Sequence, residues 1–364
     1  MKNIIKISFG IIISVLFVYL AMKDVQFTEV WRAFTQAKFF YYIFVVMGIF
    51  LVFTIRTLRW QILLAPLKKI SFYNLYSTVW ISFMMLLIMP ARLGEFARAY
   101  LVGKKENISK TGAFSSIVIE RIFDGCASIL MFIVAVIISP QSSSARITFD
   151  NMPVLSDSAK MVFKHFFEIT TNPNNTVNLS FPIINLVYLV SIFYAAALVF
   201  VVLLRLFKNK TVSATLSLLF FLPVKIKDKI SEILFSFIKG LDCLTDVKSL
   251  CVSIFYSLLI WGITGTYMYL MLLSFGIEPQ FHVAFIILGF TVIGVMIPAA
   301  PGFIGTYHYM IMIAFKYYVG DDKNVAASYA WVSWAIGTLG TIAVGLYYLK
   351  KEKLTISSLT GSSK

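Results

Sequence analysis

The stretch IMPARLGEFARAYLVGKK, from Ile88 to Lys105, decides how this chain is organised. It follows directly on a strongly apolar run, VWISFMMLL, at 79–87. It brings a proline, a glycine, a carboxylate and several basic side chains to the end of an apolar helix. Charge inside hydrocarbon is costly, so such a stretch marks either a functional site or a place where the chain turns.

The composition of the chain predicts an integral membrane protein. Its 364 residues are 59% hydrophobic and only 13% charged, whereas a soluble domain has about 25% charged residues. We expect an all-α polytopic membrane protein with a single membrane domain over 1–364 and almost no length for a soluble catalytic domain. The net charge of +15 indicates topology and anionic headgroups rather than nucleic acid.

Long apolar runs give the predicted helices, since a helix needs about 20 residues to span the hydrocarbon. The runs are 4–22, 39–55, 73–90, 112–139, 182–204, 249–275, 281–300, 303–318 and 325–349. The first could be a cleaved signal peptide. Its apolar part is longer than a usual signal core, which favours a first membrane helix.

The basic residues predict the orientation of the runs. A cytoplasmic N-terminus places a basic cluster after run 39–55 in the cytoplasm; it consists of Arg56, Arg59, Lys68 and Lys69. If 73–90 crossed fully, the basic residues that follow would lie outside, against the positive-inside tendency. We therefore predict a re-entrant hairpin at 73–110, a second, opposed hairpin at 281–318, and two cytoplasmic termini. An inverted repeat would produce this pattern. The alternative, in which every run crosses, stays open because the hairpin arms are long.

Two further segments complete the predicted topology. The polar segment 140–181 is predicted as an external loop. The segment 225–246 has apolar residues at helical spacing and charges elsewhere, which predicts an amphipathic helix. It would lie on the cytoplasmic interface or, alternatively, pack across the inner mouth of the bundle.

The first candidate site is PARLGEFAR, at the tip of the first predicted hairpin. Pro90 and Gly94 break the helix, and a helix that restarts there places Glu95 and Arg98 on one face. A helix N-terminus between Arg92 and Arg98 would suit a phosphate group. The alternative is that these arginines only anchor the protein at lipid headgroups.

The second candidate site is ERIFD, at 120–124 inside the apolar run 112–139. Glu120 and Asp124 are four residues apart and share a helix face, with Arg121 beside them. Charge at this depth should face the bundle interior or a wet cavity, and it is a functional candidate by default. The alternative is a purely structural ion-pair network with the arginines of the first hairpin.

The third candidate site is PAAPGFIGTYHY, which breaks the second predicted hairpin. Its hinge residues are Pro298, Pro301, Gly302 and Gly305. Broken helices in the middle of the membrane often frame transporter sites. His308 could titrate near neutral pH and is a candidate for proton coupling; alternatively, it is a hydrogen-bonded structural residue.

The sequence has no motif for ATP binding or for metal binding. No Walker A motif occurs, so we expect no direct use of ATP. Three cysteines and three histidines show no metal-ligand spacing. We therefore predict no metal, no cofactor and no enzymatic activity.

Together these motifs resemble a known family. RTLRWQILL, which includes Arg59, then PARLGEFARAYL, ERIFD and PAAPGFIGTYH look like the lysylphosphatidylglycerol synthase transmembrane-region family, also called the flippase-like domain family. The resemblance covers about 5–350. It implies a lipid flippase without the cytosolic aminoacyl-transferase domain of bifunctional members. Many members read PGGxGxxE at the last motif, whereas His308 stands here in place of the acid.

The prediction is thus a flippase that moves a phosphate-bearing glyco- or aminolipid between leaflets of the bacterial inner membrane. The candidate substrate-binding residues are Arg59, Arg92, Glu95, Arg98, Glu120, Arg121 and Asp124. The expected partners are the lipid and the membrane, without nucleic acid, and a homo-oligomer is compatible with the sequence. One alternative is a glycosyltransferase-like enzyme that uses a polyprenyl-phosphate sugar, suggested by Asp24 just after the first run. Another is an assembly protein without transport.

Overall fold

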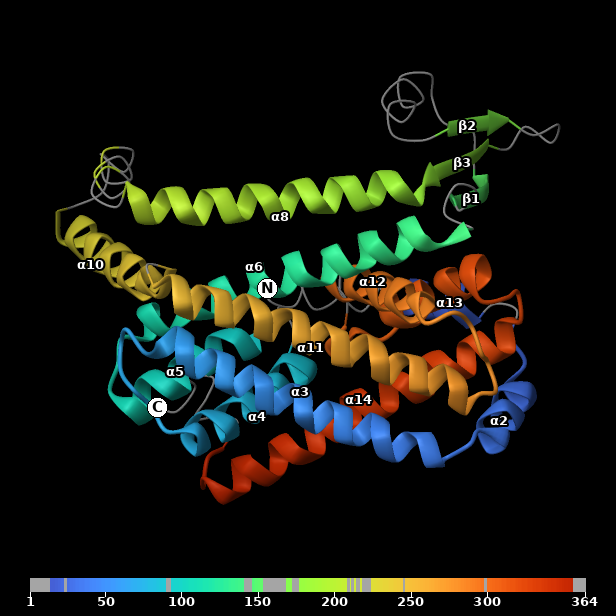
Figure 1. Ribbon diagram of the computed structural model, residues 1–364, viewed down its shortest axis with the longest axis horizontal. Helices are drawn as coiled ribbons and strands as arrows, with labels where there is room; N and C mark the ends of the chain where they lie inside the picture. The colour runs from blue at the N-terminus through green and yellow to red at the C-terminus, as the bar shows by residue number, and fades with distance from the viewer. Residues whose placement is uncertain are drawn as a thin grey trace.

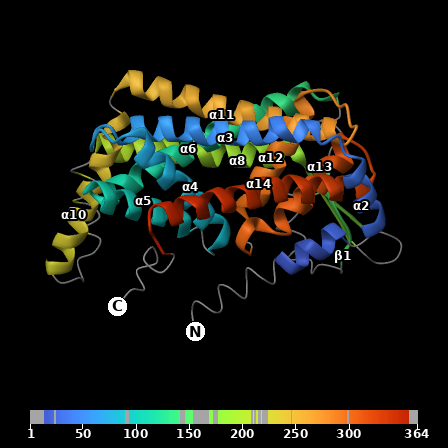
Figure 2. The same ribbon diagram turned by 90° about the horizontal axis from the view of Figure 1, so that it is seen from below.

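The computed structural model describes residues 14–22, 25–89, 93–140, 146–152, 168–171, 177–207, 224–244, 246–297 and 300–355, together with 210, 213 and 217. These residues form a bundle of helices, which confirms the predicted all-α membrane class. The longest helices run along one common direction (Figure 1). A turned view shows the same arrangement (Figure 2).

Within the described residues, four helices are long and apolar enough to span a membrane. They are α3, Phe40–Leu64; α6, Lys110–Ile138; α11, Val247–Ser274; and α14, Lys323–Lys351. Helix α8, Ile183–Leu206, is a further apolar helix of 24 residues and contacts α6. Shorter helices pack around them: 14–22; α2, Phe27–Gln36; α4, Phe72–Ile88; α5, Leu93–Glu106; α10, Val224–Gly240; α12, His282–Met296; and α13, Thr306–Tyr318.

Helices α4 and α5 form a helical hairpin inside the predicted range 73–110. Asn74, in the first turn of α4, donates a hydrogen bond of 2.8 Å to the carboxylate of Glu106, the last residue of α5. Lys68, just after α3, donates to the same carboxylate at 3.0 Å. The start of α4 and the end of α5 therefore lie together, at the end of the bundle where α3 finishes.

Helices α12 and α13 form a second hairpin that starts from the opposite end. The main-chain N–H of Lys38, before α3, donates to the carbonyl of Ser274 at the end of α11. The second hairpin follows α11 from that end. Its tip contains a short 3₁₀ turn, η4, Pro301–Phe303, and contacts α4. The two hairpins thus enter from opposite ends and meet in the middle of the bundle.

Each hairpin is packed into its own apolar core. The core around the first hairpin contains Trp60 and Trp80, which are 0% and 1% exposed. The Trp80 ring stacks on Phe53 with 3.6 Å between ring centres. The core around the second hairpin contains Phe290 and Tyr329, both fully buried. Close packing of these large rings holds each hairpin against its neighbouring long helices, since van der Waals contact drives helix association in a membrane.

The segment that we predicted as an external loop contains a small antiparallel sheet. Its strands are β1, Arg146–Met152; β2, Glu168–Thr171; and β3, Val177–Pro182, in the order β1-β3-β2. The register pairs Ile147 with Phe181 and Ile169 with Leu179. These strands were not predicted from the sequence.

The predicted amphipathic helix is α10, followed by a 3₁₀ turn, η3, at Leu241–Leu244. It packs against α6, where Ile238 and Leu241 are 4% and 0% exposed. Ile233 and Phe235 are 45% and 46% exposed on other faces of the same helix. Helix α10 therefore has one face against the bundle and another that is exposed, while its position on the cytoplasmic interface stays a prediction.

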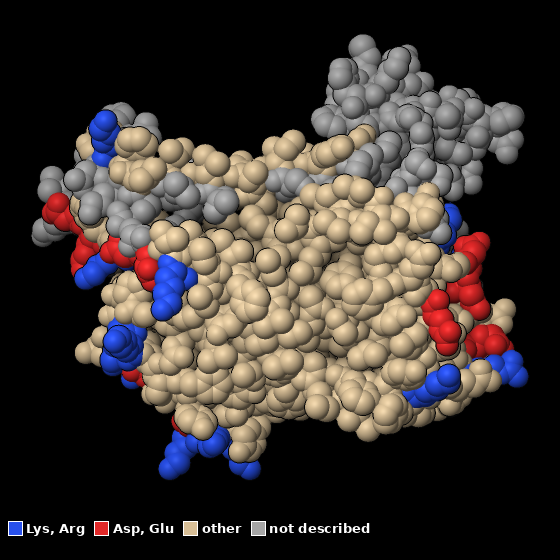
Figure 3. Space-filling model, in the orientation of Figure 1, with Lys and Arg blue, Asp and Glu red and all other residues tan. Residues whose placement is uncertain are grey.

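Charged side chains gather at the two ends of the long helices and leave a band of other residues between them (Figure 3). At the end that carries Glu106, Lys105 bonds to Glu352, just after α14, at 2.7 Å. Lys350 and Lys351 lie in the last turn of α14 at that same end. An uncharged band between two charged ends is the surface expected of a membrane-spanning protein.

Candidate functional site

Two arginines of α3 lie inside the bundle, so the prediction that this helix ends at 55 and that both arginines follow it was wrong. Arg56 is 9% exposed and Arg59 is 0% exposed. Helix α3 continues past 55 to Leu64. The helix does not stop at the first charge because both guanidinium groups find carboxylates on α6, which offset the cost of burying them.

The carboxylate of Asp124, on α6, accepts hydrogen bonds from three side chains. Its carboxylate oxygens lie 2.6 Å from Arg59 Nη1 and 3.0 Å from Arg56 Nη1. The indole N–H of Trp261, on α11, donates to it at 3.3 Å. Arg59 also donates to the hydroxyl of Ser257, on α11, at 2.6 Å. This carboxylate therefore ties together α3, α6 and α11.

Glu120, one turn earlier on α6, collects three arginines and is 0% exposed. Arg98 of α5 donates to its carboxylate through the two terminal guanidinium nitrogens, Nη1 and Nη2, at 2.9 and 3.1 Å. Arg121 Nη2 lies at 2.8 Å and Arg59 Nη2 at 3.4 Å. The guanidinium of Arg98 also lies 3.8 Å from the ring centre of Trp60, which adds a cation–π contact. Arg98 is thus held by the carboxylate of Glu120 and the ring of Trp60.

Arg121 and Glu95 form the accessible edge of this cluster. Their side chains are 30% and 21% exposed, and Arg121 Nε lies 3.6 Å from Glu95 Oε1. We call the whole cluster the buried ion network; its members are Arg56, Arg59, Glu95, Arg98, Glu120, Arg121 and Asp124. Among the described residues, four guanidinium groups against three carboxylates give this network a formal excess of one positive charge inside the bundle. An anion would neutralise it.

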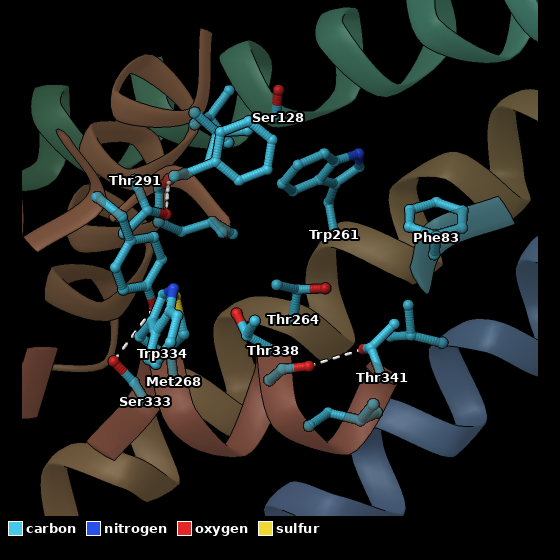
Figure 4. A pocket seen from close by; sticks show the side chains of 18 of the residues that line it. Phe83, Ser128, Trp261, Thr264, Met268, Thr291, Ser333, Trp334, Thr338 and Thr341 are labelled. Atoms are coloured by element: carbon cyan, nitrogen blue, oxygen red, sulfur yellow. Dashed lines mark hydrogen bonds between the residues drawn. The ribbon is translucent and has the colours of Figure 1, made fainter. Parts of the chain in front are cut away.

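A cavity of about 400 Å³ opens beside the network. Arg56, Arg121 and Asp124 line it. The guanidinium groups of both arginines lie 5.2 and 5.5 Å from the ring of Phe83. Phe83 and Trp334 lie on opposite sides of this space, with Trp261 between them (Figure 4). The cavity therefore has a cationic end near Phe83, and the rest of its lining is mainly apolar, with hydroxyl and indole groups among the apolar side chains.

The cavity lies between the two hairpins. The first hairpin contributes Phe83, and the second contributes Gly302 and Tyr307. The remaining walls come from α3, α6, α8, α11 and α14. A site between two opposed, interrupted helix pairs is the usual place for substrate in secondary transporters.

The structure brings together most of the predicted substrate-binding residues. Arg59, Glu95, Arg98, Glu120, Arg121 and Asp124 all belong to the buried ion network. Arg92, which we predicted as a phosphate ligand, lies outside the described residues, as do the hinge residues Pro90 and Pro298. Arg98 is 2% exposed and does not line the cavity, so its guanidinium orients Glu120 in this geometry.

The remaining hinge residues sit where the chain turns. Gly302 and Gly305 have positive φ angles of 72° and 92°, a conformation that favours glycine. Pro301 opens the 3₁₀ turn η4, which contains Gly302 and precedes Gly305. Gly94 lies against the main chain of α4, with no room for a side chain.

His308 closes the turn of the second hairpin. It is 2% exposed, and its Nδ1 accepts a hydrogen bond of 3.4 Å from the main-chain N–H of Gly305. Its ring centre lies 4.0 Å from that of Trp331. These contacts give His308 a structural role at the start of α13, while its predicted role in proton coupling stays a prediction.

Sequence reasoning missed Arg56 and the α11 residues Ser257 and Trp261 as parts of the site. The spacing of Arg56 and Arg59, three residues apart, was a usable signal, because it places both on one helix face. The α11 residues carry no sequence signal of this kind. They join the site only because α11 packs against α3 and α6.

Comparison with known proteins supports the family resemblance that the sequence motifs indicated. A family model described as the lysylphosphatidylglycerol synthase TM region matches residues 7–156 and 162–350. No match was found among curated proteins. Since the family match covers nearly the whole described bundle and all residues of the buried ion network, the chain belongs to the lysylphosphatidylglycerol synthase transmembrane-region family.

Proposed function

We propose that this protein is a transporter that moves a phosphate-bearing lipid between the leaflets of the bacterial inner membrane. The observation that carries the proposal is the excess of positive charge in the buried ion network, placed at the wall of a cavity between two opposed hairpins. An unneutralised charge in a membrane interior is expensive and marks a functional site. A lipid phosphate supplies the missing negative charge.

In this proposal Arg56 and Arg121 bind the phosphate. Both line the cavity, and guanidinium groups bind phosphate with two parallel hydrogen bonds. Arg59 and Arg98 lie behind them, and with Glu120 and Asp124 they fix the positions of the two ligands. Arg59 and Arg98 are positioning residues because neither lines the cavity.

The two hairpins give the site access from either end of the bundle. Separation of the first hairpin from α14 and α6 would open the cavity to one leaflet, and separation of the second would open it to the other. The basic end of the bundle, with Lys105, Lys350 and Lys351, is the cytoplasmic one in this proposal. Both termini stay in the cytoplasm in this proposal, as the sequence predicts. The protein does no covalent chemistry on the lipid. Asp24, on which an enzymatic alternative would rest, lies outside the described residues.

Substitution of Arg121 by Gln tests this proposal. Removal of a charged hydrogen-bond partner costs about 1.5–3 kcal/mol, so we expect the lipid translocation rate to fall roughly ten- to a hundredfold. The fold should survive, because the ion pair of Glu120 with Arg98 and those of Asp124 with Arg56 and Arg59 are retained. The measurement is dithionite quenching of a fluorescent phospholipid in vesicles that contain the purified protein.

Arg32→Gln is the matched control. Arg32 lies on α2 with a side chain that is 67% exposed, and it pairs only loosely with Glu29 at 3.4 Å. Its variant should translocate lipid at the rate of the unmodified protein. Equal rates for the unmodified protein, the Arg121 variant and protein-free vesicles would refute the proposal.

A further inference from the structure

Hydroxyl side chains line the cavity away from its cationic end. They come from four helices, and we call them the hydroxyl wall: Ser128, Thr264, Thr291, Ser333, Thr338 and Thr341. Thr264, on α11, and Thr338, on α14, lie on neighbouring sides of the space below Trp261 (Figure 4). A cavity that held only acyl chains would gain nothing from so many hydroxyl groups.

Most of the hydroxyl wall can only accept hydrogen bonds. Thr264 donates its hydrogen to the carbonyl of Ile260 at 2.7 Å, and Thr341 donates to Gly337 at 2.7 Å. Thr291 and Ser128 donate in the same way to carbonyls one turn earlier. A hydroxyl that has donated its hydrogen keeps oxygen lone pairs. The wall therefore offers acceptors to a ligand that carries several donors.

The indole rings beside the hydroxyl wall can contact a ligand through their ring faces, whereas their N–H groups are already bonded. The N–H of Trp261 is bonded to Asp124, and that of Trp334 is bonded to the carbonyl of Gly302 at 2.7 Å. Both rings line the cavity. Apolar ring faces next to hydroxyl acceptors match a group that has both C–H and O–H on its surface.

The charges of the cavity argue against an amine as the part of the ligand that donates hydrogen bonds to the hydroxyl wall. Among the described residues that line it, the charged ones are Arg56, Arg121 and Asp124. The carboxylate of Asp124 already holds Arg56, Arg59 and Trp261. An ammonium group would meet the excess positive charge of the network without a free counter-ion, and burial of an unpaired charge is costly.

We propose that the transported lipid has an uncharged polyol, such as a sugar or cyclitol ring, attached to its phosphate, and not an aminoacyl group. The phosphate binds Arg56 and Arg121, and the ring lies against Trp261 with its hydroxyls directed to Thr264 and Thr338. A cavity of about 400 Å³ is in the range that holds small-molecule ligands. This inference rests on the function proposed above and narrows its substrate.

The test compares three fluorescent lipids in vesicles that contain the full-length protein: phosphatidylinositol, phosphatidic acid and lysylphosphatidylglycerol. We expect phosphatidylinositol to be translocated at least fivefold faster than lysylphosphatidylglycerol. The double variant Thr264→Val, Thr338→Val should lower the ratio of the phosphatidylinositol rate to the phosphatidic acid rate at least fivefold. Valine has nearly the shape of threonine and lacks only the hydroxyl, so the fold is retained.

Thr266→Val is the matched control, because Thr266 lies on the same helix, donates to Gly262 at 2.9 Å and is exposed away from the cavity. It should leave the rate ratio unchanged. An equal or greater rate for the lysyl lipid, or an unchanged ratio in the double variant, overturns the inference and leaves the proposed function standing.

If no lipid is translocated in these vesicles, a binding measurement tests the headgroup preference separately from the transport function. Native mass spectrometry of the purified protein should then show retention of phosphatidylinositol over lysylphosphatidylglycerol, lost in the double variant, which supports the inference while the transport function fails. Retention of deacylated glycerophosphoinositol to the same extent as the lipid would make a soluble polyol phosphate the ligand and overturn the lipid assignment.

Discussion

Glu120→Gln is expected to destabilise the protein by about 3–5 kcal/mol, the usual cost of leaving a buried charge without its partner. Glu120 is fully buried and receives Arg98 through two hydrogen bonds, with Arg121 and Arg59 close by. Glutamine keeps the size of the side chain but removes its charge. The network would then hold four guanidinium groups against two carboxylates. The measurement is the free energy of unfolding in mixed detergent micelles.

Glu29→Gln is the control for this prediction. Glu29 forms an exposed ion pair with Arg32 on α2, and such surface pairs contribute about 0–1 kcal/mol. Its variant should unfold like the unmodified protein. A Glu120 variant as stable as the control would mean that the buried ion network does not hold α3, α5 and α6 together.

Gly94→Ala is expected to destabilise the first hairpin by about 3 kcal/mol, near the upper end for overpacking. A Cβ at this position would lie within 3.0 Å of the main-chain nitrogen of Leu86 and the carbonyl oxygen of Ser82. Because both are backbone atoms of α4, no side chain can move aside, and α5 would have to shift. That shift would also displace Arg98 and Glu95 from the network, so translocation should fall with stability.

Gly340→Ala provides the comparison for the glycine variant. Gly340 lies inside α14, and a Cβ there would meet nothing within 4 Å. Alanine favours a helix over glycine by about 1 kcal/mol, so this variant should be as stable as the unmodified protein or more stable. Equal unfolding energies for the Gly94 and Gly340 variants would contradict the close contact between α4 and α5.

The family gives this chain a membrane domain but does not fix its substrate. His308 contacts Gly305 and Trp331. Among the described residues that line the cavity, the one carboxylate is that of Asp124, which is already bonded to two arginines and an indole. The headgroup preference proposed above follows from these residues and not from the family name.

The sequence by itself determined the membrane class, the main helices, the places of the two hairpins and the family. Apolar runs, helix breakers and the bias of basic residues are local signals, and each depends only on neighbouring residues. The motifs PARLGEFAR and ERIFD also identified Glu95, Arg98, Glu120, Arg121 and Asp124 as polar residues in an apolar setting. The small sheet at 146–182 gave no comparably clear signal.

Only the tertiary structure decided which of these residues can reach a ligand. Arg56 and Arg98 look equivalent in the sequence, yet Arg56 lines the cavity whereas Arg98 is closed in by Glu120 and Trp60. Thr264 and Thr338 are separated in the sequence by the whole second hairpin. They line one cavity only because α11 and α14 both border it. The physical reason is that pairing, burial and access depend on contacts between distant helices, whereas helix formation and membrane insertion depend on local sequence.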